Sequence, residues 1–168
     1  MSTKNFVFEN PAKNVAELTS WNGYDIKDPY CVAAMTVVAM EAYIASPENG
    51  LAMLNLLKGP QPLSTAETAF LKEQLGMSSK KYLPRSYFNG ATPDNDYTPS
   101  TPWTVTVSDN LYSDAENGYK KLFIRSGGAD SIREVKLRRK DSTGEWFLWE
   151  HVGLLPGIRD PKSADPWA

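Results

Sequence analysis

The residues that could perform chemistry in this chain are few. The sequence holds one histidine, His151, and one cysteine, Cys31. A serine or cysteine nucleophile needs a base within hydrogen-bond reach, and a zinc site needs several thiolate or imidazole ligands. Because a lone histidine and a lone cysteine supply neither arrangement well, we expect a structural or surface role for His151 and a core position for Cys31.

Carboxylates are the remaining candidates for acid, base or metal chemistry. Asp94 and Asp96 flank Asn95 and could offer oxygen ligands to a hard cation, but the segment lacks the glycine and the terminal glutamate of an EF-hand loop. Asx residues beside a proline commonly bond their own backbone in turns. We therefore predict no metal site and no catalytic residue. The chain also lacks a P-loop or a dinucleotide fingerprint, so we expect no cofactor.

These Asx residues belong to a 17-residue connection, Tyr87–Trp103, that is rich in turn formers and aromatic at both ends. A connection of this length is uncommon inside a compact domain and is usually functional or disordered. Its aromatic residues favour an ordered loop. We expect Phe88 and Trp103 to pack against the rest of the domain. The loop residues that we expect to be free for binding are Asn89, Asp94, Asn95, Asp96 and Tyr97.

Helix signals precede this loop. Asp28-Pro29 and Ser46-Pro47 each place an N-cap residue before a proline at the first helical position, and Ser64 and Glu67 have the spacing of a capping box. The patterns predict helices over residues 29–45, 47–58 and 65–75, with a further helix around 15–21. The helix predicted over residues 29–45 is apolar nearly all round, which predicts that it is the central helix.

After the loop, the apolar period changes from about 3.6 residues to 2, which is typical of strands. Strands are predicted over residues 103–108, 119–125, 132–139 and 145–152. Short connections between consecutive strands indicate an antiparallel meander. The sequence thus predicts an α+β fold, with an N-terminal helical half of three to four helices packed on a C-terminal four-stranded antiparallel β-meander.

One face of the predicted sheet is a candidate binding surface. If the aliphatic residues of the second and third strands face the helices, the opposite face carries basic and aromatic side chains: Lys121, Phe123, Arg125, Lys136 and Arg138, joined by either Phe147 and Trp149 or Trp146 and Leu148. Basic groups interleaved with aromatic rings can bind an acidic partner or stack nucleic-acid bases. The C-terminal Trp167 is a natural cover for this face.

Length and composition suit a soluble protein of one domain. The 168 residues are 41% apolar and 23% charged. We divide the single domain 1–168 into a helical layer (28–76), a long ordered loop (77–102), an antiparallel sheet (103–152) and a C-terminal tail (153–168). The lone cysteine excludes an internal disulfide, and the N-terminal residues do not resemble a secretory signal, so we expect a cytoplasmic location. The longest apolar run is too short to span a bilayer, so no membrane association is expected.

The net charge of −2 conceals an asymmetry. Residues 1–118 carry 8 Lys and Arg against 13 Asp and Glu, whereas residues 119–168 carry 10 against 7. Nucleic-acid binders usually have a stronger basic excess over the whole domain. A protein or a small molecule is therefore the more plausible partner, and the sequence gives no prediction of oligomeric state.

Three blocks of sequence carry a resemblance: residues 53–64 (MLNLLKGPQPLS), 87–99 (YFNGATPDNDYTP) and 122–131 (LFIRSGGADS). Together they make the chain resemble an uncharacterised bacterial family, a domain of unknown function common in gut Firmicutes, from about Asp28 to the Asp165-Pro166-Trp167 ending. The resemblance implies one complete cytoplasmic domain and brings no activity or site residues.

The best functional hypothesis is a non-enzymatic binding module, because catalytic groups are scarce. Its site would combine the long loop with the sheet face, including Arg125, Lys136, Arg138 and Trp149. One specific version is a partner-neutralising protein, such as an immunity protein. A small hydrolase that uses Asp94, Asp96 or Glu150 as acid or base is the alternative, and nucleic-acid binding through the basic face is a second alternative.

Overall fold

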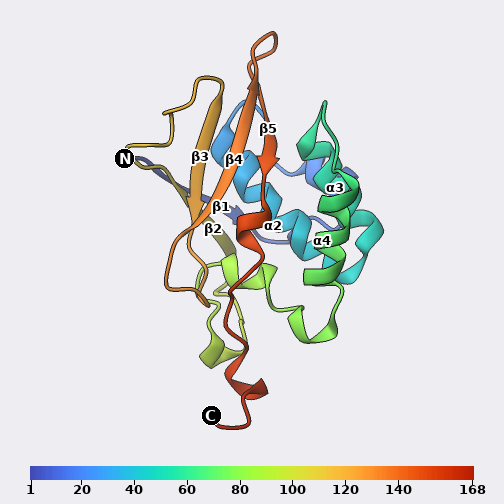
Figure 1. The fold of residues 1–168 in the computed structure, drawn as a ribbon, viewed down its shortest axis with the longest axis vertical. Coiled ribbons are helices and arrows are strands. Elements are labelled where there is room, and N and C mark those ends of the chain that lie inside the picture. The colour runs from blue at the N-terminus through green and yellow to red at the C-terminus, as the bar shows by residue number, and fades with distance from the viewer.

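The structure, a computed structural model of residues 1–168, has four α-helices on one side of an antiparallel sheet (Figure 1). This confirms the predicted α+β class. In chain order the elements are β1 (Thr3–Phe8), α1 (Val15–Ser20), α2 (Pro29–Ala45), α3 (Pro47–Lys58), α4 (Thr65–Leu75), β2 (Trp103–Ser108), β3 (Tyr119–Ile124), β4 (Arg133–Lys140) and β5 (Glu145–Glu150).

The sheet has five strands in the order β1-β2-β3-β4-β5, each antiparallel to its neighbours. Strands β2 to β5 form the predicted meander. The prediction of four strands was wrong, because β1 pairs with β2 along its whole length, from Thr3 opposite Ser108 to Phe8 opposite Trp103. The sequence of β1 does not alternate between apolar and polar residues and its partner lies far along the chain, so no local pattern indicated it.

The helices begin where their capping residues predict. The Asp28 carboxylate accepts a hydrogen bond from the backbone N–H of Tyr30 at 2.9 Å, and Ser46 caps the first turn of α3. At α4, Ser64 and Glu67 each accept from the other's backbone N–H at 3.0 Å. These bonds satisfy N–H groups that have no partner within the helix. The predicted helix around residues 15–21 is also present as α1.

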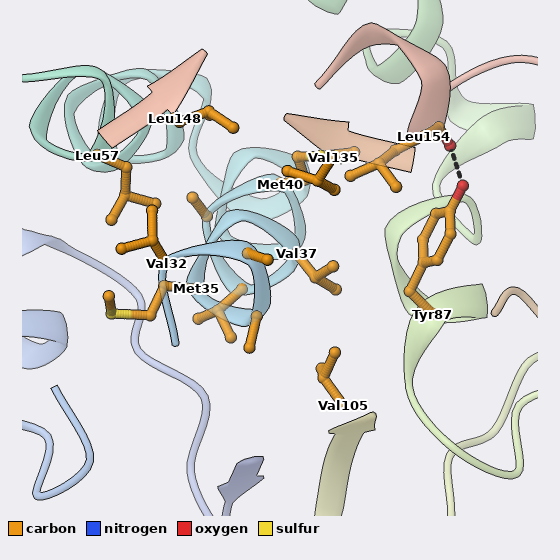
Figure 2. Packing of buried hydrophobic residues seen from close by; sticks show 14 of the residues in the cluster. Val32, Met35, Val37, Met40, Leu57, Tyr87, Val105, Val135, Leu148 and Leu154 are labelled. Carbon is orange, nitrogen blue, oxygen red and sulfur yellow. Dashed lines mark hydrogen bonds between the residues drawn. The ribbon is translucent and has the colours of Figure 1, made fainter. Parts of the chain in front are cut away.

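Helix α2 is the centre of the hydrophobic core, as its apolar surface predicts. Every residue from Tyr30 to Met40 is buried. Figure 2 shows its side chains meeting those of the surrounding elements, among them Leu57 of α3, Val105 of β2, Val135 of β4 and Leu148 of β5. Burying each such side chain contributes about 1.5–3 kcal/mol, so α2 is the element around which the helices and the sheet assemble. Neither α2 nor any other helix has the length and apolarity that a membrane crossing requires.

The sheet turns one face toward α2 and leaves the other without a covering helix (Figure 1). The aliphatic residues that were predicted to face the helices are buried, namely Leu122 and Ile124 on β3 and Val135 and Leu137 on β4. Leu148 of β5 faces the same side and is 1% exposed. Because side chains alternate along a strand, Phe147 and Trp149 lie on the outer face, which decides between the two orientations that the sequence allowed.

The C-terminal segment runs beside the long connection between α4 and β2 (Figure 1). The Tyr87 hydroxyl donates to the carbonyl oxygen of Leu154 (Figure 2), and the Tyr82 hydroxyl donates to Asp160 at 2.7 Å. The expectation that Trp167 covers the outer sheet face was wrong, since this side chain is 92% exposed. Instead, the hydrogen bonds from Tyr82 and Tyr87 hold the C-terminal segment against the connection between α4 and β2.

Candidate functional site

The polar residues of the long loop mostly stabilise the loop itself. The Asn95 side chain accepts hydrogen bonds from the backbone N–H groups of Thr92 and Thr98, both at 3.0 Å, and donates to the carbonyl of Gly90 at 2.8 Å. Asn89 donates to the Thr106 hydroxyl on β2 at 2.9 Å. Such side-chain bonds replace missing backbone partners in irregular structure. They leave Asn95 little capacity for a ligand, whereas Asn89 is exposed and uses only one of its N–H donors.

Tyr97 lies inside the domain and has no exposed surface. Its ring stacks on that of Tyr82 with centroids 4.9 Å apart, and its hydroxyl donates to the carbonyl oxygen of Arg159. A Cβ at Gly128 would lie 2.1 Å from the same hydroxyl, so the turn after β3 also packs on it. Tyr97 therefore contacts three other parts of the chain: the residues before the loop at Tyr82, the turn after β3 at Gly128 and the C-terminal segment at Arg159.

The carboxylates of the hydrolase alternative lie on two different parts of the chain. Asp94 lies 3.6 Å from Lys162, and Asp96 accepts a hydrogen bond from Ser163, both in the C-terminal segment. Glu150 lies on β5, opposite Lys136 of β4. No cluster of three or more His, Cys, Asp or Glu side chains could hold a metal ion.

The lone histidine and cysteine are both buried. His151 has no exposed surface, neither ring nitrogen has a hydrogen-bond partner, and burial lowers its pKa to about 4. The Cys31 thiol donates to the carbonyl of Gly23 at 3.2 Å, and burial raises its pKa to about 12. At neutral pH the imidazole is uncharged and the thiol is protonated. Both residues pack in the interior, which was predicted for Cys31, whereas the sequence left a surface position open for His151.

The outer sheet face gathers four residues into what we call the aromatic–basic patch: Tyr119, Lys136, Arg138 and Trp149. The strand register places Tyr119 opposite Arg138. The Arg138 guanidinium lies 4.7 Å from the Trp149 ring centroid and 5.5 Å from that of Tyr119. The two rings meet edge to face at 5.7 Å, and the Lys136 ammonium lies 4.7 Å from the centroid of Tyr119. Period-2 alternation on β3, β4 and β5 is what brings these side chains to one face.

Of the two cations in the patch, Lys136 has a carboxylate partner and Arg138 has none. Lys136 lies 2.8 Å from the Glu116 carboxylate, and this hydrogen bond raises the pKa of the lysine. Arg138 is exposed and has no carboxylate partner, so only the two aromatic rings hold its guanidinium. Arg125, which follows the last residue of β3, takes no part in these contacts. The patch therefore unites three of the predicted site residues and leaves Arg125 apart.

A groove of about 430 Å³ adjoins the patch, between the end of α3 and the β4–β5 hairpin. It is lined by Lys58, Pro60, Gln61, Arg138, Arg139, Lys140, Asp141, Phe147 and Trp149. The ring of Phe147 packs directly on Gly59, where a Cβ would lie 2.2 Å from it. Sequence analysis missed this groove. Arg138, Arg139 and Lys140 are consecutive in the sequence, but no local pattern indicates that β5 lies beside the end of α3.

Fold and surface together define an α+β domain whose sheet has one face buried under helices and one face open, with an aromatic–basic patch on the open face. Residues 10–162 match the model of a family described as a domain of unknown function (DUF6935), and the chain belongs to this family. The match confirms the resemblance to an uncharacterised family over most of the chain. No curated protein and no solved structure matches.

Proposed function

We propose that this chain is a non-enzymatic binding module that engages an acidic protein through the aromatic–basic patch. The observation that carries the proposal is the Arg138 guanidinium, which is exposed, stacked on Trp149 and Tyr119, and without a carboxylate partner. Its guanidinium N–H groups donate no hydrogen bond to the rest of the chain, and a guanidinium fork matches a carboxylate in two-pronged geometry.

Aromatic stacking prepares Arg138 for an interface. A cation over an aromatic face gains roughly 0.5–1 kcal/mol at an exposed site, and the two rings restrict where the guanidinium can point. Less side-chain entropy is then lost when a partner binds. Arginine, tryptophan and tyrosine are also the residue types most enriched among those that dominate interface energies.

The charge distribution favours an acidic partner. Residues 119–168 have a net charge of +3, in a chain whose total is −2. A local basic field steers an acidic protein toward this end of the sheet. Glu116 and Glu150 lie close to Lys136 and interrupt the basic surface, which suits the local acidic groups of a protein better than a continuous phosphate backbone.

The finer version of the proposal is a partner-neutralising protein, similar in role to an immunity protein, which blocks the function of the acidic protein that it binds. Its support is the combination of small size, a sequence with one histidine and one cysteine, and a preformed basic surface. The single buried cysteine suits a reducing cytoplasm, which we propose as its location. The hydrolase alternative has less support, because Asp94 and Asp96 contact the C-terminal segment whereas Glu150 lies on β5, opposite Lys136.

The test is affinity capture from the source organism, followed by measurement of binding with the purified captured protein. We compare the wild-type chain with Arg138→Glu and with Arg125→Glu, a matched control that changes an exposed arginine outside the patch. An acidic protein should bind the wild type and the control, and its affinity should fall at least about tenfold for Arg138→Glu.

Three outcomes would contradict the proposal. The first is that no protein is recovered, and the second is that a recovered protein binds Arg138→Glu as tightly as the wild type. The third is a ligand that nuclease removes and whose affinity falls steeply with salt in both variants, which would favour the nucleic-acid alternative.

A further inference from the structure

The groove beside the aromatic–basic patch has a buried charge at its base. The Lys58 side chain lines the groove although it is only 4% exposed, whereas Arg138, Arg139 and Lys140 are exposed around it. The Lys58 ammonium donates to the Glu67 carboxylate at 3.1 Å and to the carbonyl of Trp149 at 3.2 Å. An ammonium has three N–H donors, so one donor of Lys58 has no partner in the protein.

Buried donors in native proteins nearly always have partners. Lys58 is one of the residues that line the groove, and we infer that its third N–H is available to an acceptor atom of a ligand there. This feature separates Lys58 from a lysine that serves only to hold Glu67. It also requires that the ligand bring a hydrogen-bond acceptor to the base of the groove.

The remaining charges give the groove an excess of positive charge. Arg139 is paired with Asp141 at 2.9 Å and Lys58 with Glu67, so each of these cations is compensated. Arg138 and Lys140 line the groove without a carboxylate partner. Two uncompensated cations beside a buried ammonium favour an anionic ligand over a neutral or cationic one.

The walls of the groove are partly apolar. Phe147 packs on Gly59 and, with Pro60 and Trp149, provides flat surfaces between the charged groups. The volume of about 430 Å³ falls within the range of small-molecule sites, roughly 300–1,000 Å³. Such sites combine apolar walls with a few polar groups that fix orientation.

We propose that this groove binds a small molecule with a flat ring and a carboxylate or phosphate group, the ring against Phe147 and the anion between Lys58, Arg138 and Lys140. The site shares Arg138 and Trp149 with the aromatic–basic patch, but it does not depend on the existence of a protein partner. A ligand held there would compete with that partner for the Arg138 guanidinium.

The experiment titrates the full-length chain with three anionic probes and their neutral counterparts, followed by NMR. The pairs are benzoate with benzamide, indole-3-acetate with indole-3-acetamide, and adenosine monophosphate with adenosine, so that carboxylate and phosphate are separated. At least one anionic probe should shift the signals of residues 58–61 and 138–149, with an affinity at least about tenfold above that of its neutral counterpart.

Two variants locate the site. Lys58→Met removes the ammonium at the base but also its bonds to Glu67 and Trp149, so its folding must be checked. Gln61→Trp places an indole in the groove from an exposed residue whose side chain makes no hydrogen bond. Either folded variant should weaken the probe at least about tenfold, while Arg125→Glu should bind it as the wild type does.

The inference is overturned if no anionic probe shifts the groove residues, if neutral probes bind equally well, or if Gln61→Trp binds like the wild type. Protein capture by the patch and anion binding by the groove can fail separately. Loss of partner binding in Arg138→Glu without any anion in the groove would leave the proposed function and remove this inference. Anion binding in the groove without any captured protein would support this inference and contradict the proposed function.

Discussion

Gly127 lies against the carbonyl oxygen of Ala91 so closely that a Cβ at position 127 would be 1.8 Å from that oxygen. The backbone N–H of Gly127 also donates to the carbonyl of Ser86 at 2.8 Å. The turn after β3 is therefore packed directly on the long loop. Two of the sequence blocks that carry the family resemblance, 87–99 and 122–131, meet at this contact, which gives both a structural reason for their composition.

Gly127→Ala is expected to destabilise the fold by about 2–3 kcal/mol, because the clashing atom belongs to the backbone and cannot rotate away. Gly153→Ala is the matched control, since a Cβ there would lie 3.4 Å from its nearest neighbour, the carbonyl oxygen of Glu134. Urea unfolding of both variants measures the difference. Equal transition midpoints for the two would show that the loop yields to the added methyl group.

Local sequence signals were sufficient for the helices and for the meander. The caps at Asp28, Ser46 and Ser64 depend on residues within three positions, and the alternation on β3 and β4 depends on neighbours along one strand. For the same reason the outer position of Lys136 and Arg138 could be predicted. These features are fixed by short-range geometry and need no knowledge of tertiary contacts.

The features that escaped prediction depend on contacts between distant segments. Strand β1 is recognised only through its pairing with β2, and the burial of Tyr97 depends on Tyr82, Gly128 and the C-terminal segment. The groove is formed where the end of α3 reaches β5. The sequence indicates that the residues on both segments are suited to packing, but it does not indicate which two segments contact each other.

Glu41 is the only charged residue of α2, and Arg85 compensates it. The Arg85 guanidinium donates to Oε1 of Glu41 at 2.5 and 3.2 Å and lies 5.3 Å from the Trp103 ring centroid, while Oε2 has no partner. Arg85→Met is expected to destabilise the fold by about 3–5 kcal/mol at pH 7, because it leaves a largely buried carboxylate unpaired.

The double variant Arg85→Met with Glu41→Gln is the control, and it should recover a large part of that loss because no charge remains to be buried. Burial already raises the pKa of Glu41 in the presence of Arg85. Without the arginine, protonation of the carboxylate should narrow the difference in stability between Arg85→Met and the wild type as the pH is lowered from 7 toward 5. Urea unfolding at the two pH values measures this, and a loss unchanged in the double variant would contradict the account.

Strand β1 contributes to the core through Phe8, although it precedes the span matched by the family model. Phe8 is 2% exposed, stacks on Trp21 with centroids 4.4 Å apart and meets the edge of Phe88 at 6.5 Å. Phe8→Ala should cost about 3–5 kcal/mol, as expected for truncation of a buried aromatic residue. The control is Val7→Ala, which changes a 45% exposed residue of the same strand. Similar thermal midpoints for the two variants would mean that β1 is only loosely attached.

His151 should make the fold sensitive to acid. Its pKa is lowered to about 4 by burial, from an ordinary value of 6.5, although the Glu67 carboxylate 3.9 Å away opposes the shift and Lys58 adds to it. The unfolded chain therefore binds a proton between pH 6.5 and 4 that the folded chain does not, so stability is lost as the pH falls through this window. The loss at pH 4 is expected to be about 3 kcal/mol.

His151→Leu should remove most of this dependence of stability on pH, as measured by urea unfolding from pH 7 to 4. If the variant and the wild type lose stability in parallel, the acid sensitivity comes from other groups.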